Sequence, residues 1–118
     1  MVKFQNVTKI YPRNSYGSIS KVVLDGVSFE VNNKEFVSLV GRSGAGKTTL
    51  FKLLLAEEQP TKGRIFFDNQ DVCKIKRNNL FQLRRRIGTV FQDYKLLPLK
   101  TVFENIAYVM EVIGKSDE

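Results

Sequence analysis

The sequence predicts an α/β fold in which a parallel β-core adjoins an antiparallel β-sheet. Three observations lead to this prediction. Residues 36–40 are apolar almost throughout, which is typical of a strand buried on both faces. A glycine-rich turn at 41–48 follows, and an apolar run typical of a helix comes next at 49–56. Residues 2–11 alternate between apolar and polar side chains, as in a strand with one buried face.

The other elements follow from similar patterns. After a polar loop at 12–20, residues 21–31 form a second strand region, which Asp25 and Gly26 interrupt. Beyond the helix we expect a strand at 64–68, a short basic helix at 78–86 and a strand at 87–91.

The last element is a helix with clear end signals. Thr101 and Glu104 have the spacing of a capping box, and apolar residues recur at helical spacing from 102 to 113. Gly114 suits the position just after a helix end. We interpret the apolar stripe as core or as a docking face.

Composition excludes several classes of function. The chain of 118 residues is near the common size of one domain, with 42% hydrophobic and 26% charged residues. It contains no histidine, which rules out histidine-dependent triads and histidine metal sites within it. Cys73 is the only cysteine, so no internal disulfide or thiolate cluster can form, and we interpret it as a small apolar filler.

Positive charge is concentrated in one part of the chain. The net charge is +7, and residues 62–100 alone hold ten Lys or Arg against three Asp or Glu. Such a segment can meet anionic lipid headgroups or nucleic acid, or can be a solvated helix face. We favour the solvated face.

The turn at 41–48 reads Gly-Arg-Ser-Gly-Ala-Gly-Lys-Thr and matches the P-loop pattern G-x-x-x-x-G-K-[ST] at every fixed position. A strand before it and a helix after it are the setting that a P-loop requires. Gly41, Gly44 and Gly46 permit positive φ values and let backbone amides approach a phosphate closely. The sequence therefore predicts a site for nucleotide phosphates.

Each part of this loop has an expected role. The amides of residues 43–49 and the positive end of the following helix form a concave anion site. Lys47 supplies a mobile charge for the β- and γ-phosphates and is the expected catalytic cation, while the Thr48 hydroxyl is an expected Mg²⁺ ligand. We assign no chemistry to the side chains of Arg42 and Ala45. The predicted nucleotide site comprises Gly41, Arg42, Ser43, Gly44, Ala45, Gly46, Lys47, Thr48 and Thr49.

Four stretches, at residues 7–11, 23–29, 41–49 and 88–92, together resemble the ATP-binding subunit of ABC transporters, and the resemblance covers nearly the whole chain. It implies that Tyr11 stacks on the adenine of ATP. It also implies that Gln92, at the family's Q-loop position, is a catalytic residue and a contact of Mg²⁺. By themselves, Tyr11 could be an ordinary strand aromatic and Gln92 an exposed polar residue. The stretch at 93–105 is most similar to a cell-division branch of the family, with the lipoprotein-release and macrolide-export branch as runner-up.

The resemblance also implies partners. Two full-length subunits would form a homodimer around two ATP molecules, in the cytoplasm on the inner face of the plasma membrane. An integral membrane subunit would dock on residues 92–110. An apolar run in a predicted loop supports such docking, because loops are normally polar; it comprises Tyr94, Leu96, Leu97 and Leu99. Alternatively, these leucines pack onto the helix at 101–113.

Residues 1–118 are expected to be the N-terminal portion of one ABC-type nucleotide-binding domain. The sequence contains neither the family's Leu-Ser-Gly-Gly-Gln signature nor its apolar strand ending in Asp-Glu. Residues 64–68 imitate that strand only superficially, since Asn69 follows Asp68, and we expect no metal site there.

We therefore expect this chain alone to bind ATP with negligible turnover, while the full-length protein is an ATPase. Two rival hypotheses stay open. One is a non-catalytic fragment that binds its partner through residues 92–113, and the second is a nucleic-acid-associated P-loop protein that uses the basic residues 74–86.

Overall fold

The structure is a computed structural model of the chain, and it describes residues 1–12 and 20–114. Most of the predicted loop at 12–20 lies outside the described residues. The chain divides into two compact units, Met1–Leu80 and Phe81–Glu118.

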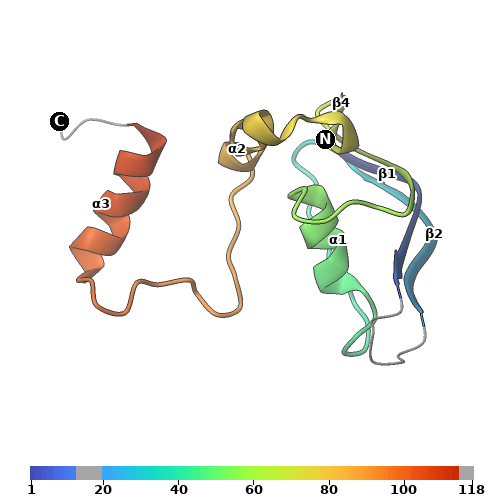
Figure 1. Ribbon diagram of the computed structural model, residues 1–118, viewed down its shortest axis with the longest axis horizontal. Helices are drawn as coiled ribbons and strands as arrows, with labels where there is room; N and C mark the ends of the chain where they lie inside the picture. Colours follow the sequence, from blue (N-terminus) through green and yellow to red (C-terminus); the bar gives the residue numbers. More distant parts are fainter. Residues whose placement is uncertain (13–19, 115–118) are drawn as a thin grey trace. The chain divides into compact units, whose positions relative to one another are not determined.

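An antiparallel sheet forms the first unit's framework. Its strand order is β2-β1-β3-β4, so β1 lies between β2 and β3 and runs antiparallel to both (Figure 1). The predicted strands at 2–11, 21–31 and 64–68 are confirmed, the last with slightly shifted ends. The four strands are β1 (Val2–Tyr11), β2 (Lys21–Val31), β3 (Lys62–Phe67) and β4 (Gln70–Asp71).

The register of β1 brings apolar side chains together on one face. Phe4 pairs with Phe29 of β2 and with Ile65 of β3, and the two phenylalanine rings stack with their centroids 4.6 Å apart. Register shifts follow where the pairing of β1 passes Asp25 and Gly26, the predicted interruption of β2. Gly26 has a φ of 57°, and its amide donates to Thr8 Oγ1 at 3.1 Å, so the irregular pairing is held by a side chain.

Helix α1 (Lys47–Leu54) confirms the predicted helix, beginning two residues earlier than the apolar pattern indicates. Leu53 of α1 is buried, as are Phe4, Val7 and Ile65 of the sheet. Two short 3-10 helices follow β4, namely η1 (Val72–Lys74) and η2 (Arg77–Asn79). The carboxylate of Asp71 accepts a hydrogen bond from the Cys73 amide at 3.0 Å and thereby begins η1.

Two predicted strands are wrong. Neither residues 36–40 nor residues 87–91 form a strand, and Phe36 and Val40 are 91% and 94% exposed. A parallel strand exists only in hydrogen bonds with a neighbouring strand, and no described strand pairs with residues 36–40. The α/β class and the antiparallel sheet are confirmed, whereas the parallel core does not form within the described residues.

Two helices lie wholly or mostly in the described part of the second unit. The predicted basic helix at 78–86 divides into η2 and α2 (Leu80–Arg85), so it spans the border between the two units. Helix α3 (Val102–Ile113) has both halves of the predicted capping box: the Glu104 amide donates to Thr101 Oγ1 at 3.2 Å, and the Thr101 amide donates to Glu104 Oε2 at 2.8 Å. Gly114 closes α3 with a left-handed φ of 77°. Within the described part of the chain, no helix has the length and apolar character to cross a membrane.

Candidate functional site

The predicted P-loop is a turn that leads directly into α1. Gly46 is the N-cap of α1, with a φ of 91°, and Gly44 has a φ of 77°; both values favour glycine. A Cβ atom at Gly46 would also lie 2.9 Å from Leu24 Cδ2 and 3.1 Å from the Val23 carbonyl oxygen. Glycine is therefore favoured at residue 46 mainly by its backbone conformation, and the nearby Val23 carbonyl of β2 adds to this preference.

The N-terminus of α1 offers backbone donors to an anion. Its first i→i−4 hydrogen bond is donated by the Leu50 amide to the Gly46 carbonyl, at 3.0 Å. The amides of residues 46–49 precede this bond and so have no acceptor within the helix. No side chain caps Gly46, and the helix dipole adds partial positive charge at this end. This arrangement is suited to binding phosphate oxygens.

Lys47 brings a full positive charge into the same turn. Its Nζ donates to the Gly41 carbonyl at 2.7 Å and to the Arg42 carbonyl at 2.9 Å. These bonds hold the ammonium against the loop. Thr48 is exposed, so its hydroxyl is open to a ligand, whereas Thr49 is buried.

This donor set fits a magnesium-bound nucleotide phosphate. Amides and an ammonium suit phosphate oxygens, and an exposed hydroxyl suits Mg²⁺. Among the described residues, no group of three or more His, Cys, Asp or Glu side chains could hold a metal ion. Phosphate oxygens and water would then supply most of the remaining ligands of Mg²⁺ at Thr48, as this ion commonly retains several waters.

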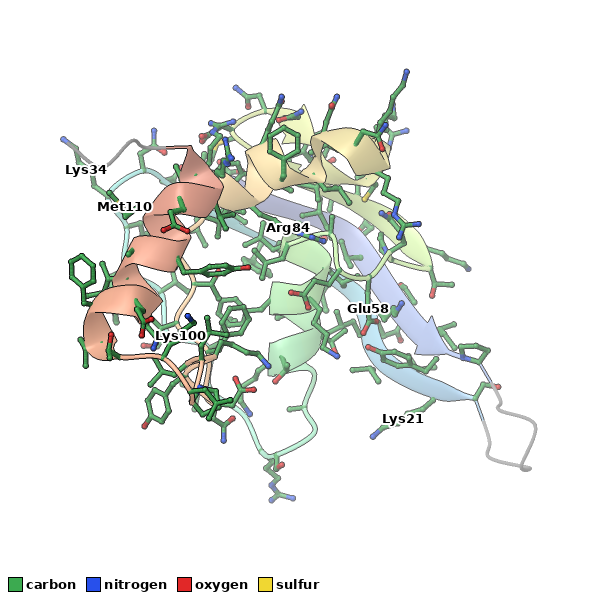
Figure 2. The ribbon with its side chains drawn as sticks, turned by 60° about the vertical axis from the view of Figure 1, so that its left-hand side comes forward. Lys21, Lys34, Glu58, Arg84, Lys100 and Met110 are labelled. Carbon is green, nitrogen blue, oxygen red and sulfur yellow. The ribbon has the colours of Figure 1, made fainter. Side chains whose placement is uncertain are left out.

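Tyr11 ends β1 in the same unit as the P-loop, and its side chain is half-buried. Its hydroxyl donates to Glu58 Oε2 at 2.6 Å, and Lys9 Nζ lies 4.9 Å from the ring centroid. Glu58 follows α1 and lies between that helix and β1 in Figure 2. Sequence reasoning missed Glu58 because 47 residues separate it from Tyr11 and no local pattern links them.

Glu58 carries a negative charge at neutral pH. The hydrogen bond from the Tyr11 hydroxyl is the largest cause that lowers the pKa of this carboxyl group, and the nearby Lys9 ammonium, 3.1 Å away, lowers it further. Partial burial opposes these effects without reversing them.

Gln92 belongs to the second unit, where it is exposed in a turn. The P-loop belongs to the first unit. The predicted catalytic and metal-binding role of Gln92 therefore stays a prediction.

The apolar loop at 94–99 is exposed in the second unit. Leu96 is 68% exposed and Leu99 is 98% exposed, so their side chains are not packed onto α3. Asn105 of α3 instead fixes the loop backbone: its side-chain oxygen accepts from the Leu97 amide at 2.8 Å, and its side-chain nitrogen donates to the Leu97 carbonyl at 3.2 Å. The loop backbone is thus bonded to one polar side chain, while Leu96 and Leu99 are largely in solvent and Leu97 is 39% exposed.

The basic residues at 74–86 have exposed side chains, as a solvated face, a lipid-binding face and a nucleic-acid-binding face would all require. Lys74 lies 3.9 Å from Asp71, and Arg85 Nη2 donates to the Val112 carbonyl at 2.9 Å. Asp68 ends the segment 64–68, which superficially imitates the family's Asp-Glu strand. Its carboxylate accepts a hydrogen bond from the N-terminal ammonium at 2.6 Å and so has a cationic partner.

Comparison with known proteins identifies the family. Residues 24–118 match the family model described as ABC transporter. The cell division ATP-binding protein FtsE of Bacillus subtilis (strain 168) is 45% identical over 115 residues, which are 98% of this chain and 48% of that protein. The methionine import ATP-binding protein MetN of Geobacillus kaustophilus is 41% identical over 118 residues, 100% of this chain and 34% of that protein.

A solved structure agrees with these relatives. The dimeric ATP-binding cassette MJ0796, in a post-hydrolysis state bound to ADP and Pi, is 34% identical, with a TM-score of 0.82 over 100% of this chain and 49% of that one. The chain spans about half the length of the FtsE relatives that it matches. The family match covers most of the chain and includes the P-loop, and the chain therefore belongs to the ABC transporter family as part of an ATP-binding component.

Proposed function

We propose that residues 41–49 bind the phosphates of Mg-ATP, and that the full-length protein hydrolyses ATP. The observation that carries this proposal is the end of α1, where helix amides without helical acceptors adjoin the Lys47 ammonium. Lys47 would exchange its two loop carbonyls for phosphate oxygens, since a charged acceptor bonds an ammonium more strongly than a carbonyl does. A bound Mg²⁺ would neutralise phosphate charge, and the Thr48 hydroxyl would hold it.

We propose further that Tyr11 stacks on adenine and that Gln92 contacts the metal and the attacking water. Catalysis in this class is mainly positioning and charge stabilisation. Residues 1–118 include Lys47, which can stabilise charge, but they lack the family's Asp-Glu strand. Turnover by these residues alone is accordingly expected to be negligible. Residues 1–118 would be the N-terminal portion of one nucleotide-binding domain.

The narrower proposal is a role in cell division, as in FtsE. The FtsE relatives of several bacteria support it, at 37% to 45% identity over at least 98% of this chain. Phosphonate and methionine import ATP-binding proteins are similar at 39% and 41%, so an import function is a second candidate. A lipoprotein-release or macrolide-export ATPase is a third candidate, and a non-catalytic partner-binding fragment is a fourth.

We propose that an FtsX-like integral membrane partner docks on residues 92–110. The full-length protein would then be a homodimer, bound peripherally to the inner face of the plasma membrane. Two observations support the docking surface. The leucines at 96 and 99 are exposed, and the Asn105 side chain hydrogen-bonds the backbone of their loop. A preorganised apolar loop loses little entropy on binding.

Calorimetry of the full-length protein with Mg-ADP tests the phosphate site without turnover. Replacing Lys47 by Ala should weaken binding roughly 10- to 100-fold, the value of one hydrogen bond to a charged group. Lys76→Ala, which removes an exposed lysine of the basic segment, is the matched control and should leave affinity unchanged. Equal affinities of the Lys47→Ala protein and the control would defeat the phosphate assignment.

A pull-down with the FtsX-like subunit tests the docking surface. Leu96→Asp combined with Leu97→Asp should abolish capture while Mg-ADP binding is retained. Val22→Asp, which adds a charge at an exposed apolar position of β2, is the control and should be captured normally. Undiminished capture of the double variant would remove the support for docking here.

A further inference from the structure

We propose that Glu58 is a positioning residue that fixes the Tyr11 ring as a stacking platform and thereby sets how much the base adds to nucleotide affinity. The inference rests on the proposed function, since it takes Tyr11 as the residue that meets the base. It concerns the base alone and leaves the phosphate site unchanged.

Glu58 binds the one polar atom of the Tyr11 ring. The phenol oxygen donates to Glu58 Oε2 at 2.6 Å, a short hydrogen bond to a charged acceptor. A tyrosine attached only through Cβ can change both of its side-chain dihedrals, whereas a bond at the far end of the ring removes most of that freedom. Glu58 thus defines the direction of the ring plane.

Glu58 is itself held from several sides. Its Oε2 also lies 3.1 Å from Lys9 Nζ, and its Oε1 lies 3.4 Å from Lys52 Nζ of α1. Lys9 in turn donates to the Gln59 carbonyl at 2.8 Å. Both carboxylate oxygens therefore lie close to ammonium groups. The cluster links the end of β1 to α1 and to the segment that follows α1 in the sequence. Figure 2 shows Glu58 in this position.

Lys9 also determines which face of the ring is available. Its ammonium lies over the ring, 4.9 Å from the centroid, so this face already has a cation–π partner. A purine that stacks on Tyr11 would then take the opposite face. Because Glu58 and Lys9 fix the ring before any ligand arrives, stacking does not have to order the Tyr11 side chain.

The test compares two ligands that differ by the adenosine alone. The full-length protein is titrated with Mg-ADP and with Mg-pyrophosphate in a calorimeter. Glu58→Ala should weaken Mg-ADP binding roughly 2- to 10-fold, the range for ordering one side chain, and should leave pyrophosphate binding unchanged. Glu58→Gln keeps a hydrogen-bond acceptor and should restore most of the lost affinity. The control is Glu57→Ala, which removes the exposed neighbouring carboxylate and should change neither ligand.

A double-mutant cycle makes the test specific to the Tyr11 bond. Tyr11→Phe removes the hydroxyl and keeps the ring, so it should resemble Glu58→Ala, and the two changes together should cost no more than either one. Additive losses would overturn the proposal, as would equal weakening of both ligands, which indicates a merely structural role. Unchanged Mg-ADP affinity in Glu58→Ala would overturn it too. If Lys47→Ala leaves both ligands bound as before, the phosphate proposal fails instead, so the two failures are distinguishable.

Discussion

Replacing Gly63 by Ala is expected to lower the free energy of unfolding by more than the cost of a left-handed backbone conformation alone. Gly63 lies in β3 with a φ of 87°. A Cβ atom there would lie 2.3 Å from the Asn6 carbonyl oxygen and 2.5 Å from the Gln5 carbonyl oxygen. Both oxygens belong to the backbone of β1, so they cannot rotate away and the two strands must separate.

The magnitude follows from two contributions. A left-handed conformation costs an L-residue about 1–2 kcal/mol. Separation of the strands loosens two neighbouring hydrogen bonds, from the Thr61 amide to the Thr8 carbonyl at 2.8 Å and from the Ile10 amide to Thr61 Oγ1 at 2.9 Å. Each is worth about 0.5–1.5 kcal/mol, so the free energy of unfolding should fall by about 2–5 kcal/mol. This is a large part of the roughly 5–15 kcal/mol of a typical domain.

Gly26→Ala is the matched control. Gly26 lies in the same sheet with a φ of 57°, but a Cβ atom there would meet nothing within 4 Å. Only the conformational cost of about 1–2 kcal/mol applies. Urea unfolding of both full-length variants, followed by far-ultraviolet circular dichroism, measures the difference. Equal destabilisation by the two substitutions would refute the argument from close approach. Since Ile10 precedes Tyr11, Gly63→Ala should also weaken Mg-ADP binding more than pyrophosphate binding.

Three further predictions follow from single contacts. Thr101→Ala removes one half of the capping box and should lower the stability of α3 by about 0.5–2 kcal/mol, seen as faster amide hydrogen exchange in its first turns; unchanged exchange would contradict the cap's role. Asn105→Ala should speed exchange of the Leu97 amide, whose acceptor is the Asn105 side chain, whereas Asn79→Ala should not. Folding lowers the pKa of the Glu58 carboxyl group below its ordinary value of 4.5. The ionised group therefore stabilises the folded protein at a pH above 4.5, and this contribution is lost as the pH falls through the lower pKa of the folded state. The difference in urea midpoint between wild type and Glu58→Ala should therefore shrink on acidification from pH 6 to pH 3, and a constant difference would contradict the ion-pair cluster.

Local signals explain what could be predicted from the sequence. The capping box of Thr101 and Glu104 forms because its partners lie three residues apart, and the alternation along β1 needs only one buried face. The P-loop turn is likewise fixed by its own glycines, notably Gly46. The contact between Tyr11 and Glu58 depends on how β1 meets the segment after α1, and no short-range pattern encodes that.

The two wrong strands have a different cause. An apolar run such as residues 36–40 indicates that burial is favourable, but hydrogen bonds to a neighbouring strand decide whether it becomes a strand. An apolar groove of about 600 Å³ in the first unit bears this out, since Phe36, Val37 and Leu39 line it together with Phe4 and Phe29 of the sheet. These side chains have an apolar surface beside them and no described strand to pair with.

The unpaired run matters for the phosphate site because it ends immediately before Gly41. The Gly41 carbonyl accepts from Lys47 Nζ at 2.7 Å, so the position of the ammonium depends on where residue 41 is held. At the other end of the loop, Gly46 lies close to β2, so that a Cβ atom there would crowd Leu24 and Val23. One end of the P-loop thus lies close to the antiparallel sheet, while the other follows residues 36–40, which pair with no described strand. The position of the Lys47 ammonium therefore depends on where residues 36–40 place Gly41, whose carbonyl oxygen accepts its hydrogen bond.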